Sequence, residues 1–204
     1  MGPVWSLSYM GNGKCILVGK VFFDVTNPNP VDGYDYINMF NISDGNTVAQ
    51  FKAVEPFTIR LIKPVSQTKA LISADYSGLV SWNTVDKYLY EWRLKVDPPK
   101  YVCVGQSNQA LIVGKDGKGI STVDIKKGTQ LKQSSSTETV LGEPIFIGSR
   151  YYVPVNGGLM VLGTNLETIS RYDISGLKGS VSLVPAKVSM YIVGDNMLVK
   201  FDLK

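Results

Sequence analysis

One apolar pattern recurs along the chain at a fixed spacing, and this repeat constrains the fold more than any other feature. The runs ALISA, ALIVG, RYYVP and MYIVG begin at residues 70, 110, 150 and 190, so consecutive copies lie 40 residues apart. A fifth copy, KCILVG, aligns Leu17 with Leu71, a step of 54 residues that implies an insertion of about 14. A repeat of this length indicates that one supersecondary unit is stacked several times.

Each repeated unit contains four short segments with the character of β-strands. The apolar run is followed by a polar turn such as DYSG or KDGKG, and then by a second apolar run such as LVSWN or ISTVD. A leading and a trailing β-rich run complete the unit, and no segment shows a sustained helical period. Four strands in about 40 residues are typical of a propeller blade. A β-sandwich also has closely spaced strands, but it does not require a constant step.

The sequence therefore predicts an all-β fold, a single β-propeller domain of five repeat units over residues 1–204. The expected units are about 3–54, 55–96, 97–139, 140–176 and 177–204. The fifth unit ends after its third strand, at 197–203, and lacks the outer one. Such an edge leaves backbone N–H and C=O groups unpaired. Further chain, a three-stranded last blade guarded by lysines, or a strand donated by a partner would each account for it.

Composition narrows the chemistry that the chain can perform. The sequence contains no histidine, which excludes Ser-His-Asp and Cys-His triads within this chain. Its two cysteines, Cys15 and Cys103, lie in apolar runs of different units, so we expect buried free thiols. The net charge of +4 is mild and no basic run dominates, so no nucleic-acid partner is predicted.

No feature of the sequence predicts a membrane partner or secretion. No apolar run approaches the ~20 residues of a membrane span. The N-terminus, MGPVWSLS, does not combine a basic region with an apolar core. We therefore expect an intracellular, cytoplasmic protein.

The segment ISADYSGLVSWN resembles the inner hairpin of a WD-repeat blade. Trp82 and Asn83 stand where that family has its Trp-Asp pair, and Asp124 of KDGKGISTVD stands in the Asp place. The Gly-His dipeptide of the family is absent, so the chain is similar to a divergent WD-repeat-like or quinoprotein-like propeller. The resemblance implies that the turns between second and third strands and the links between units share one binding face. From the turns it places on this face Asp75, Tyr76, Asp116, Lys118, Asn156, Asp195 and Asn196, and from the links it adds Glu55, Lys95, Asp97, Lys100 and Glu138.

The insertion in the first unit, FFDVTNPNPVDGYDY from Phe22 to Tyr36, is the most individual part of this predicted face. Loops on a rigid scaffold often carry function, and aromatic side chains make good contact anchors. The other interpretation is a surface turn with incidental aromatics. With the neighbouring turn included, the predicted partner-binding residues are Phe22, Phe23, Asp24, Asp32, Tyr34, Asp35, Tyr36, Asp75 and Tyr76.

These patterns favour a noncatalytic protein-interaction scaffold that needs no cofactor or metal. The aspartates of the insertion lack the spacing of a calcium loop, and no local motif supports a pair of glycosidase carboxylates. The expected partner is a protein, with possible strand donation to the edge at 197–203. A lectin-like or small-ligand-binding propeller is the alternative, and a propeller glycosidase ranks third.

Overall fold

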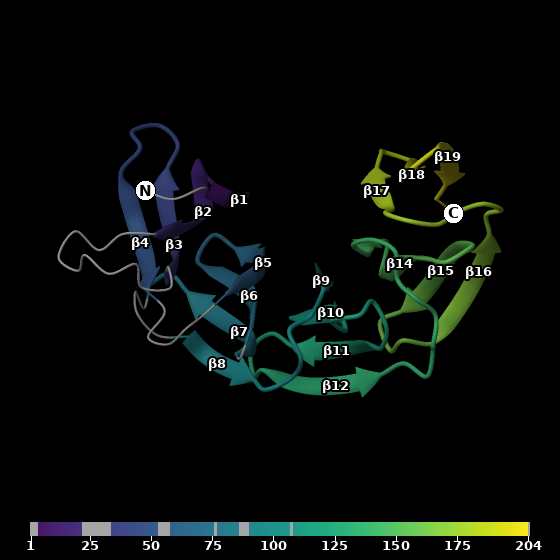
Figure 1. The fold of residues 1–204 in the computed structure, drawn as a ribbon, viewed down its shortest axis with the longest axis horizontal. Helices are drawn as coiled ribbons and strands as arrows, with labels where there is room; N and C mark the ends of the chain where they lie inside the picture. Colours follow the sequence, from purple (N-terminus) through teal and green to yellow (C-terminus); the bar gives the residue numbers. More distant parts are fainter. Residues whose placement is uncertain are drawn as a thin grey trace. The chain divides into compact units, whose positions relative to one another are not determined.

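The computed structural model describes residues 4–21, 34–52, 58–75, 77–85, 90–106 and 108–203. Within these ranges the chain forms 19 β-strands and no helix, which confirms the all-β prediction (Figure 1). The described residues accordingly contain no helix long and apolar enough to cross a membrane. The chain divides into two compact units, Met1–Pro98 and Pro99–Lys204.

The N-terminal unit consists of two four-stranded sheets, with the strand orders β1-β2-β3-β4 and β5-β6-β7-β8. The strands are β1 Val4–Gly11, β2 Lys14–Val21, β3 Tyr34–Asn41, β4 Thr47–Lys52, β5 Ile59–Ser66, β6 Lys69–Ala74, β7 Gly78–Asn83 and β8 Tyr90–Leu94.

The C-terminal unit consists of three sheets, formed by β9 to β12, β13 to β16 and β17 to β19. The strands are β9 Tyr101–Val104, β10 Gln109–Val113, β11 Ile120–Asp124, β12 Thr129–Gln133, β13 Ile145–Ile147, β14 Arg150–Val155, β15 Gly158–Gly163, β16 Thr168–Asp173, β17 Ser182–Pro185, β18 Ser189–Gly194 and β19 Met197–Asp202.

Every sheet is an antiparallel meander, because each strand pairs with the next strand of the chain. The sheets contain four, four, four, four and three strands, which confirms the predicted four-strand repeat and its shorter last member. The repeated apolar runs form the second strand of each sheet. In β6 the five residues from Ala70 to Ala74 are all buried, so both faces of this strand are covered. A strand covered on both faces reads as a continuous apolar run, which is the pattern seen in the sequence.

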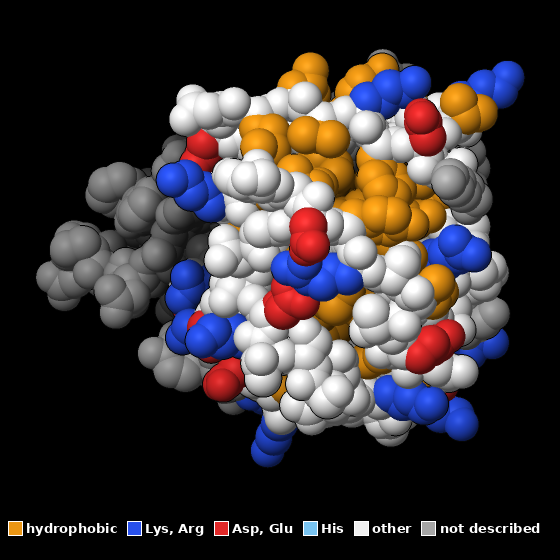
Figure 2. Space-filling model, turned by 90° about the vertical axis from the view of Figure 1, so that its right-hand side faces the viewer, with side chains coloured by type: hydrophobic (Ala, Val, Ile, Leu, Met, Phe, Trp, Pro, Cys, Tyr) orange, Lys and Arg blue, Asp and Glu red, His pale blue; other side chains and the backbone are white. Residues whose placement is uncertain are grey.

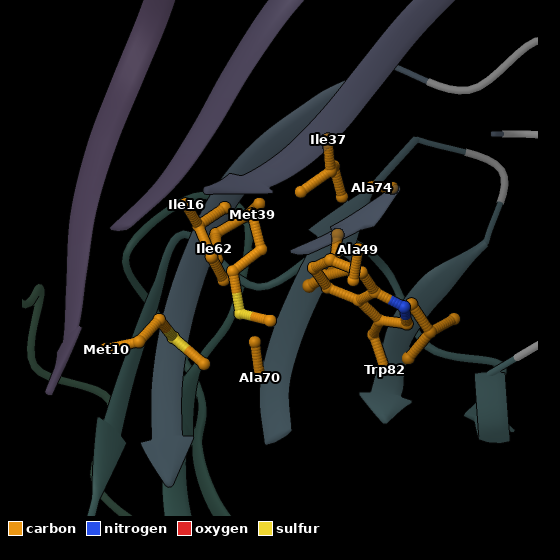
Figure 3. Close-up of a cluster of buried hydrophobic side chains, with 11 residues drawn as sticks. Met10, Ile16, Ile37, Met39, Ala49, Ile62, Ala70, Ala74 and Trp82 are labelled. Atoms are coloured by element: carbon orange, nitrogen blue, oxygen red, sulfur yellow. The ribbon is translucent and has the colours of Figure 1, made fainter. Parts of the chain in front are cut away.

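The apolar core lies in layers between neighbouring sheets, and we call each layer a seam. In the N-terminal unit one seam joins the two sheets (Figure 3). Ile16, Ile37 and Met39 of the first sheet pack toward Ala70 and Trp82 of the second. Each large apolar side chain buried in this way contributes about 1.5–3 kcal/mol of transfer free energy.

The C-terminal unit has two seams of the same construction. The first, between the β9–β12 and β13–β16 sheets, includes Cys103, Leu111, Val113, Ile120, Tyr151, Val153, Met160 and Leu162. The second, between the β13–β16 and β17–β19 sheets, includes Tyr152, Leu159, Val161, Leu183, Met190 and Ile192. Both cysteines of the chain are buried free thiols, as predicted.

The insertion in the first sheet has a shorter loop than the sequence predicts. β3 begins at Tyr34, and its first residues continue the ladder with β2 through the pairs Tyr34–Val21 and Tyr36–Gly19. The strand expected from Tyr36 begins two residues earlier, because tyrosine fits the pleated surface of a strand and the two strands pair over eight residues. The loop residues 22–33 lie outside the described ranges.

Candidate interaction surface

We call the surface formed by the turns between second and third strands and by the links between sheets the turn face. In the C-terminal unit these turns and links lie together, because they are hydrogen-bonded to one another. The amide of Val140, in the link before β13, donates to the carbonyl of Gly117 in the β10–β11 turn at 2.8 Å. The amide of Gly157, in the β14–β15 turn, donates to the carbonyl of Leu177 in the next link at 2.9 Å. Turns and links therefore form a continuous backbone surface within this unit.

A charged cluster lies on this turn face. The Nε of Arg171, on β16, donates to Glu138 at 3.1 Å, and the same guanidinium also pairs with Asp173. Its Nη2 donates to the carbonyl of Asn156 at 3.4 Å. Arg171 was not among the predicted residues, since a lone arginine in a strand carries no motif. Its partners Glu138 and Asn156 were predicted to share a face, and they do.

Asp75 occupies the predicted turn between β6 and β7, but its carboxylate is engaged. The guanidinium of Arg60, on β5, donates to both oxygens of Asp75, at 2.9 and 2.7 Å. This bond to Asp75 raises the pKa of Arg60 above its ordinary value. A partner that contacts this turn would therefore find the charge of Asp75 balanced by that of Arg60.

The other predicted partner-binding residues stay predictions. Tyr34, Asp35 and Tyr36 belong to β3, where the described structure gives their backbone pairing with β2. The rest lie outside the described residues, namely Phe22, Phe23, Asp24, Asp32 and Tyr76.

The residues that resemble the WD motif have structural partners. Trp82 is fully buried in the N-terminal seam. The side-chain amide of Asn83 donates to Glu91 of β8 at 2.9 Å. The carboxylate of Asp124 accepts the amides of Lys126 and Lys127 and so closes the β11–β12 turn. The polar bonds of Asn83 and Asp124 therefore hold their hairpins in place.

The large apolar side chains that are exposed concentrate at the C-terminal end of the chain. Figure 2 shows apolar groups gathered on the side of the molecule that carries β16 and β19 at the right of Figure 1. Seven of the twelve such residues in the described ranges lie between residues 169 and 198. They are Ile169, Tyr172, Val184, Val188, Tyr191, Val193 and Leu198. Concentrated exposed apolar surface is typical of interaction sites.

β19 has an open edge, since its one strand neighbour in the described chain is β18. The amide of Leu203, just beyond β19, donates to Val188, and antiparallel ladders alternate between bonded and non-bonded pairs. The amides of Val199 and Phe201 therefore point toward β18, whereas those of Leu198 and Lys200 point outward. The corresponding edge of β15 is occupied, because Leu159 pairs with Tyr172 of β16.

Aromatic side chains flank this open edge. The rings of Tyr172 and Phe201 lie edge to face with their centroids 4.8 Å apart, and Tyr172 is exposed. Phe201, Val199 and Met197 are half-buried and share one face of β19. We call the outer edge of β19, together with Tyr172 and Phe201, the edge surface. The number of strands in the sequence predicts the open edge of β19. The position of Tyr172 and Phe201 beside this edge follows only from the pairing of the strands in the structure.

No three residues among histidine, cysteine, aspartate and glutamate are grouped closely enough to hold a metal ion within the described ranges.

No protein-family model matches the chain, and no curated protein matches its sequence. Among solved structures, the computationally designed Ika8 protein has a TM-score of 0.69 at 15% identity, over 98% of this chain and 58% of that one. The WD40 domain of Neurospora crassa Pan2 has a TM-score of 0.68 at 10% identity, over 99% of this chain and 63% of that one. The chain thus spans less than two thirds of the length of either protein.

At these identities the likeness concerns the fold alone. The likeness to a WD40 domain agrees with five antiparallel meanders that pack through seams, and with the resemblance of the ISADYSGLVSWN hairpin. The fold of this chain is therefore that of a WD-repeat-like β-propeller.

Proposed function

We propose that this protein is a noncatalytic protein-interaction scaffold built as five propeller blades, the last of which takes its outer strand from a partner. The observation that carries this proposal is the edge surface, where outward backbone groups of β19 lie beside Tyr172 and Phe201. An exposed strand edge binds an extended peptide through main-chain hydrogen bonds, and neighbouring side chains supply specificity.

The partner at the edge surface is expected to be an extended segment with alternating apolar side chains. In the β13–β16 sheet, Tyr172 of β16 pairs with Leu159 and lies on the side that faces the next sheet. A donated strand would pair with Leu198 and Lys200 in the same manner. The side chains of the donated residues opposite Val199 and Phe201 would then lie on the same face as these two residues, which are half-buried without the added strand.

A second contact is proposed at the turn face, with the insertion from Phe22 to Tyr36 as the favoured loop. Its stem is a continuous antiparallel ladder, because β2 and β3 pair from Lys14 to Val21. A loop carried on a paired stem orders with little further loss of entropy when a partner binds. The charged cluster of Arg171 and Glu138 gives the same face a polar component.

Two substitutions at one position test strand donation. Lys200→Pro removes an outward amide and leaves the amides that bond β18 intact, which a strand edge tolerates. Lys200→Ala removes the same side chain but keeps the amide. Tagged full-length chains of wild type and both variants are incubated with lysate of the source cells, and bound proteins are quantified by mass spectrometry.

We expect Lys200→Pro to lose at least about tenfold in recovery of the main partner, while Lys200→Ala retains it, because each lost strand bond leaves a partner carbonyl unpaired. Equal recovery by the two variants, or no protein enriched above the tag alone, would show that the edge does not bind a donated strand.

A further inference from the structure

The sequence contains the dipeptide Asn-Gly twice, at Asn12–Gly13 and at Asn156–Gly157. Each copy is the two-residue loop of a hairpin, the first between β1 and β2 and the second between β14 and β15. Both asparagines are exposed. The two copies therefore share their side chain, their following residue and their access to solvent.

The amides of the two glycines differ in their hydrogen bonds. The amide of Gly157 donates to the carbonyl of Leu177 at 2.9 Å, and this bond ties its turn to the next link. Within the described residues, the one bond that the amide of Gly13 donates is to the phenol oxygen of Tyr9, at 3.4 Å. This distance is longer than the usual N–H···O range, and Tyr9 is an exposed side chain. The amide of Gly13 is therefore the more weakly bonded of the two.

The conformation of the β1–β2 turn explains why its ladder leaves this amide aside. Asn12 and Gly13 have φ values of 47° and 67°, and two consecutive residues with positive φ are typical of a type I′ turn. The closing hydrogen bond of such a turn joins the residues on either side of the loop, which here are Gly11 and Lys14. It does not use the amide of Gly13.

An asparagine that precedes glycine can lose its side-chain amide without an enzyme. The backbone nitrogen of the glycine gives up its proton to base and attacks the Cγ carbon of the asparagine. The new N–C bond closes a five-membered succinimide ring, and the bond from Cγ to the side-chain nitrogen breaks to release ammonia. Water then opens the ring at either carbonyl and yields aspartate or isoaspartate. Glycine favours the reaction because it has no side chain to obstruct the ring.

We propose that Asn12 is a site of spontaneous deamidation in the folded protein, and that the hydrogen bond of Gly157 protects Asn156 from the same reaction. The attacking nitrogen must release its proton, which the amide of Gly157 can do only after its bond to Leu177 has opened. This opening separates the β14–β15 turn from the link before β17 and therefore requires local unfolding. The amide of Gly13 requires no comparable opening.

The products would change the first turn in two ways. Aspartate adds a negative charge next to the Gly13–Lys14 segment. Isoaspartate adds a carbon atom to the main chain, so the loop no longer has the length of a type I′ turn, and the pair Gly11–Lys14 that closes the hairpin is expected to weaken. Ageing of the protein would thus charge and loosen the turn between β1 and β2.

The two asparagines serve as each other's control in one experiment on the full-length chain. The purified protein is incubated in mildly alkaline buffer, once folded and once unfolded in guanidinium chloride. Timed samples are digested under acidic conditions, which halt the reaction. Mass spectrometry of the two peptides quantifies the replacement of NH2 by OH, and chromatography separates isoaspartate from aspartate. Dividing the folded rate at each site by its unfolded rate removes the influence of the neighbouring sequence.

We expect both asparagines to react in the unfolded chain. In the folded chain the normalised rate of Asn12 should exceed that of Asn156 at least about tenfold, which corresponds to about 1.4 kcal/mol in the barrier and is of the order of one backbone hydrogen bond.

A second pair of variants tests the cause of the protection. Leu177→Ala removes a buried side chain from the link and loosens the carbonyl that accepts the bond of Gly157. It should raise the folded rate of Asn156 and leave that of Asn12 unchanged. Leu111→Ala, which removes an equally buried leucine outside this link, is the matched control.

Equal normalised rates at the two asparagines overturn the inference, as does a folded chain in which neither reacts. An equal rise at Asn156 in Leu177→Ala and Leu111→Ala also contradicts it, because global unfolding and not this hydrogen bond would then limit the reaction. These rates are independent of the comparison of Lys200→Pro with Lys200→Ala, so deamidation and strand donation fail or stand separately.

Discussion

The phenol of Tyr151 lies in a tightly packed part of the C-terminal unit. A Cβ built on Gly105 would lie 2.9 Å from the Cζ of this ring, so the glycine makes room for it. The hydroxyl is buried and has no hydrogen-bond partner among the described residues, and burial raises the pKa of Tyr151 above its ordinary value. An unpaired buried hydroxyl costs free energy that an apolar ring would not.

Tyr151→Phe should therefore raise the free energy of unfolding by about 1 kcal/mol. Urea denaturation measures the difference. Tyr101→Phe is the control with the opposite expectation, because the Tyr101 hydroxyl donates to the carbonyl of Leu141. If both variants lose stability equally, the hydroxyl of Tyr151 has a partner of comparable value.

Glu91 gives the N-terminal unit a predictable dependence on pH. Burial alone would raise the pKa of Glu91, but its bonds to Lys69, Asn83 and Ser81 outweigh this effect and lower it. The folded pKa is then below the unfolded one. The stabilisation is fully present above the unfolded pKa and is lost as the pH falls through the folded pKa.

We expect Glu91→Gln to be about 1 kcal/mol less stable than wild type at pH 7, with the gap closing below about pH 4. Denaturant midpoints measured from pH 7 to pH 3 follow the gap. Asp97→Asn, which removes a carboxylate at an exposed link position, is the control for the loss of a surface charge. A gap for Glu91→Gln that stays constant with pH would contradict the carboxylate bonds.

At the scale of the elements, the sequence predicts the repeat and its strands. It does not predict where paired strands begin or which side chains of neighbouring strands are in contact. The runs from Ala70 and Arg150 predicted central strands because both faces of such strands are buried. The start of β3 and the position of Tyr172 beside Phe201 depend on pairing between strands. The pattern of a single strand does not encode that pairing, so it predicts neither the start of β3 at Tyr34 nor the contact between Tyr172 and Phe201.

The stem of the insertion predicts that its loop is dispensable for folding. Val21 pairs with Tyr34, so removal of Asn27–Gly33 would leave a five-residue connection, which hairpins accommodate. The deleted chain should unfold cooperatively with a midpoint close to that of wild type, while binding at the turn face weakens. Circular dichroism during thermal unfolding provides the measurement, and loss of the cooperative transition would show that the loop packs on the fold.

The open edge of β19 predicts an alternation in amide exchange. In the purified full-length chain, the amides of Val199 and Phe201 bond to β18 and should be protected, while those of Leu198 and Lys200 should exchange rapidly. Hydrogen exchange followed by NMR resolves the single residues. Equal protection of all four would mean that another strand already covers the edge.

At the scale of the whole molecule, stability follows the number of seams. In repeat proteins each unit contributes its own folding term and an interface term with its neighbour. Met1–Pro98 contains one seam between two sheets, and Pro99–Lys204 contains two seams among three sheets. The seams of the C-terminal unit also bury two large tyrosine rings, those of Tyr151 and Tyr152.

Separate expression of the two units should therefore give unequal stability. We expect Pro99–Lys204 to unfold cooperatively and at a higher urea concentration than Met1–Pro98, because it keeps more interface terms per sheet. Both fragments are followed by tryptophan fluorescence and circular dichroism, with a tryptophan introduced at Phe146 of the C-terminal unit, whose residues include none. If Met1–Pro98 were as stable as Pro99–Lys204, each sheet would be stable without its neighbour, and the seams would contribute little to the free energy of unfolding.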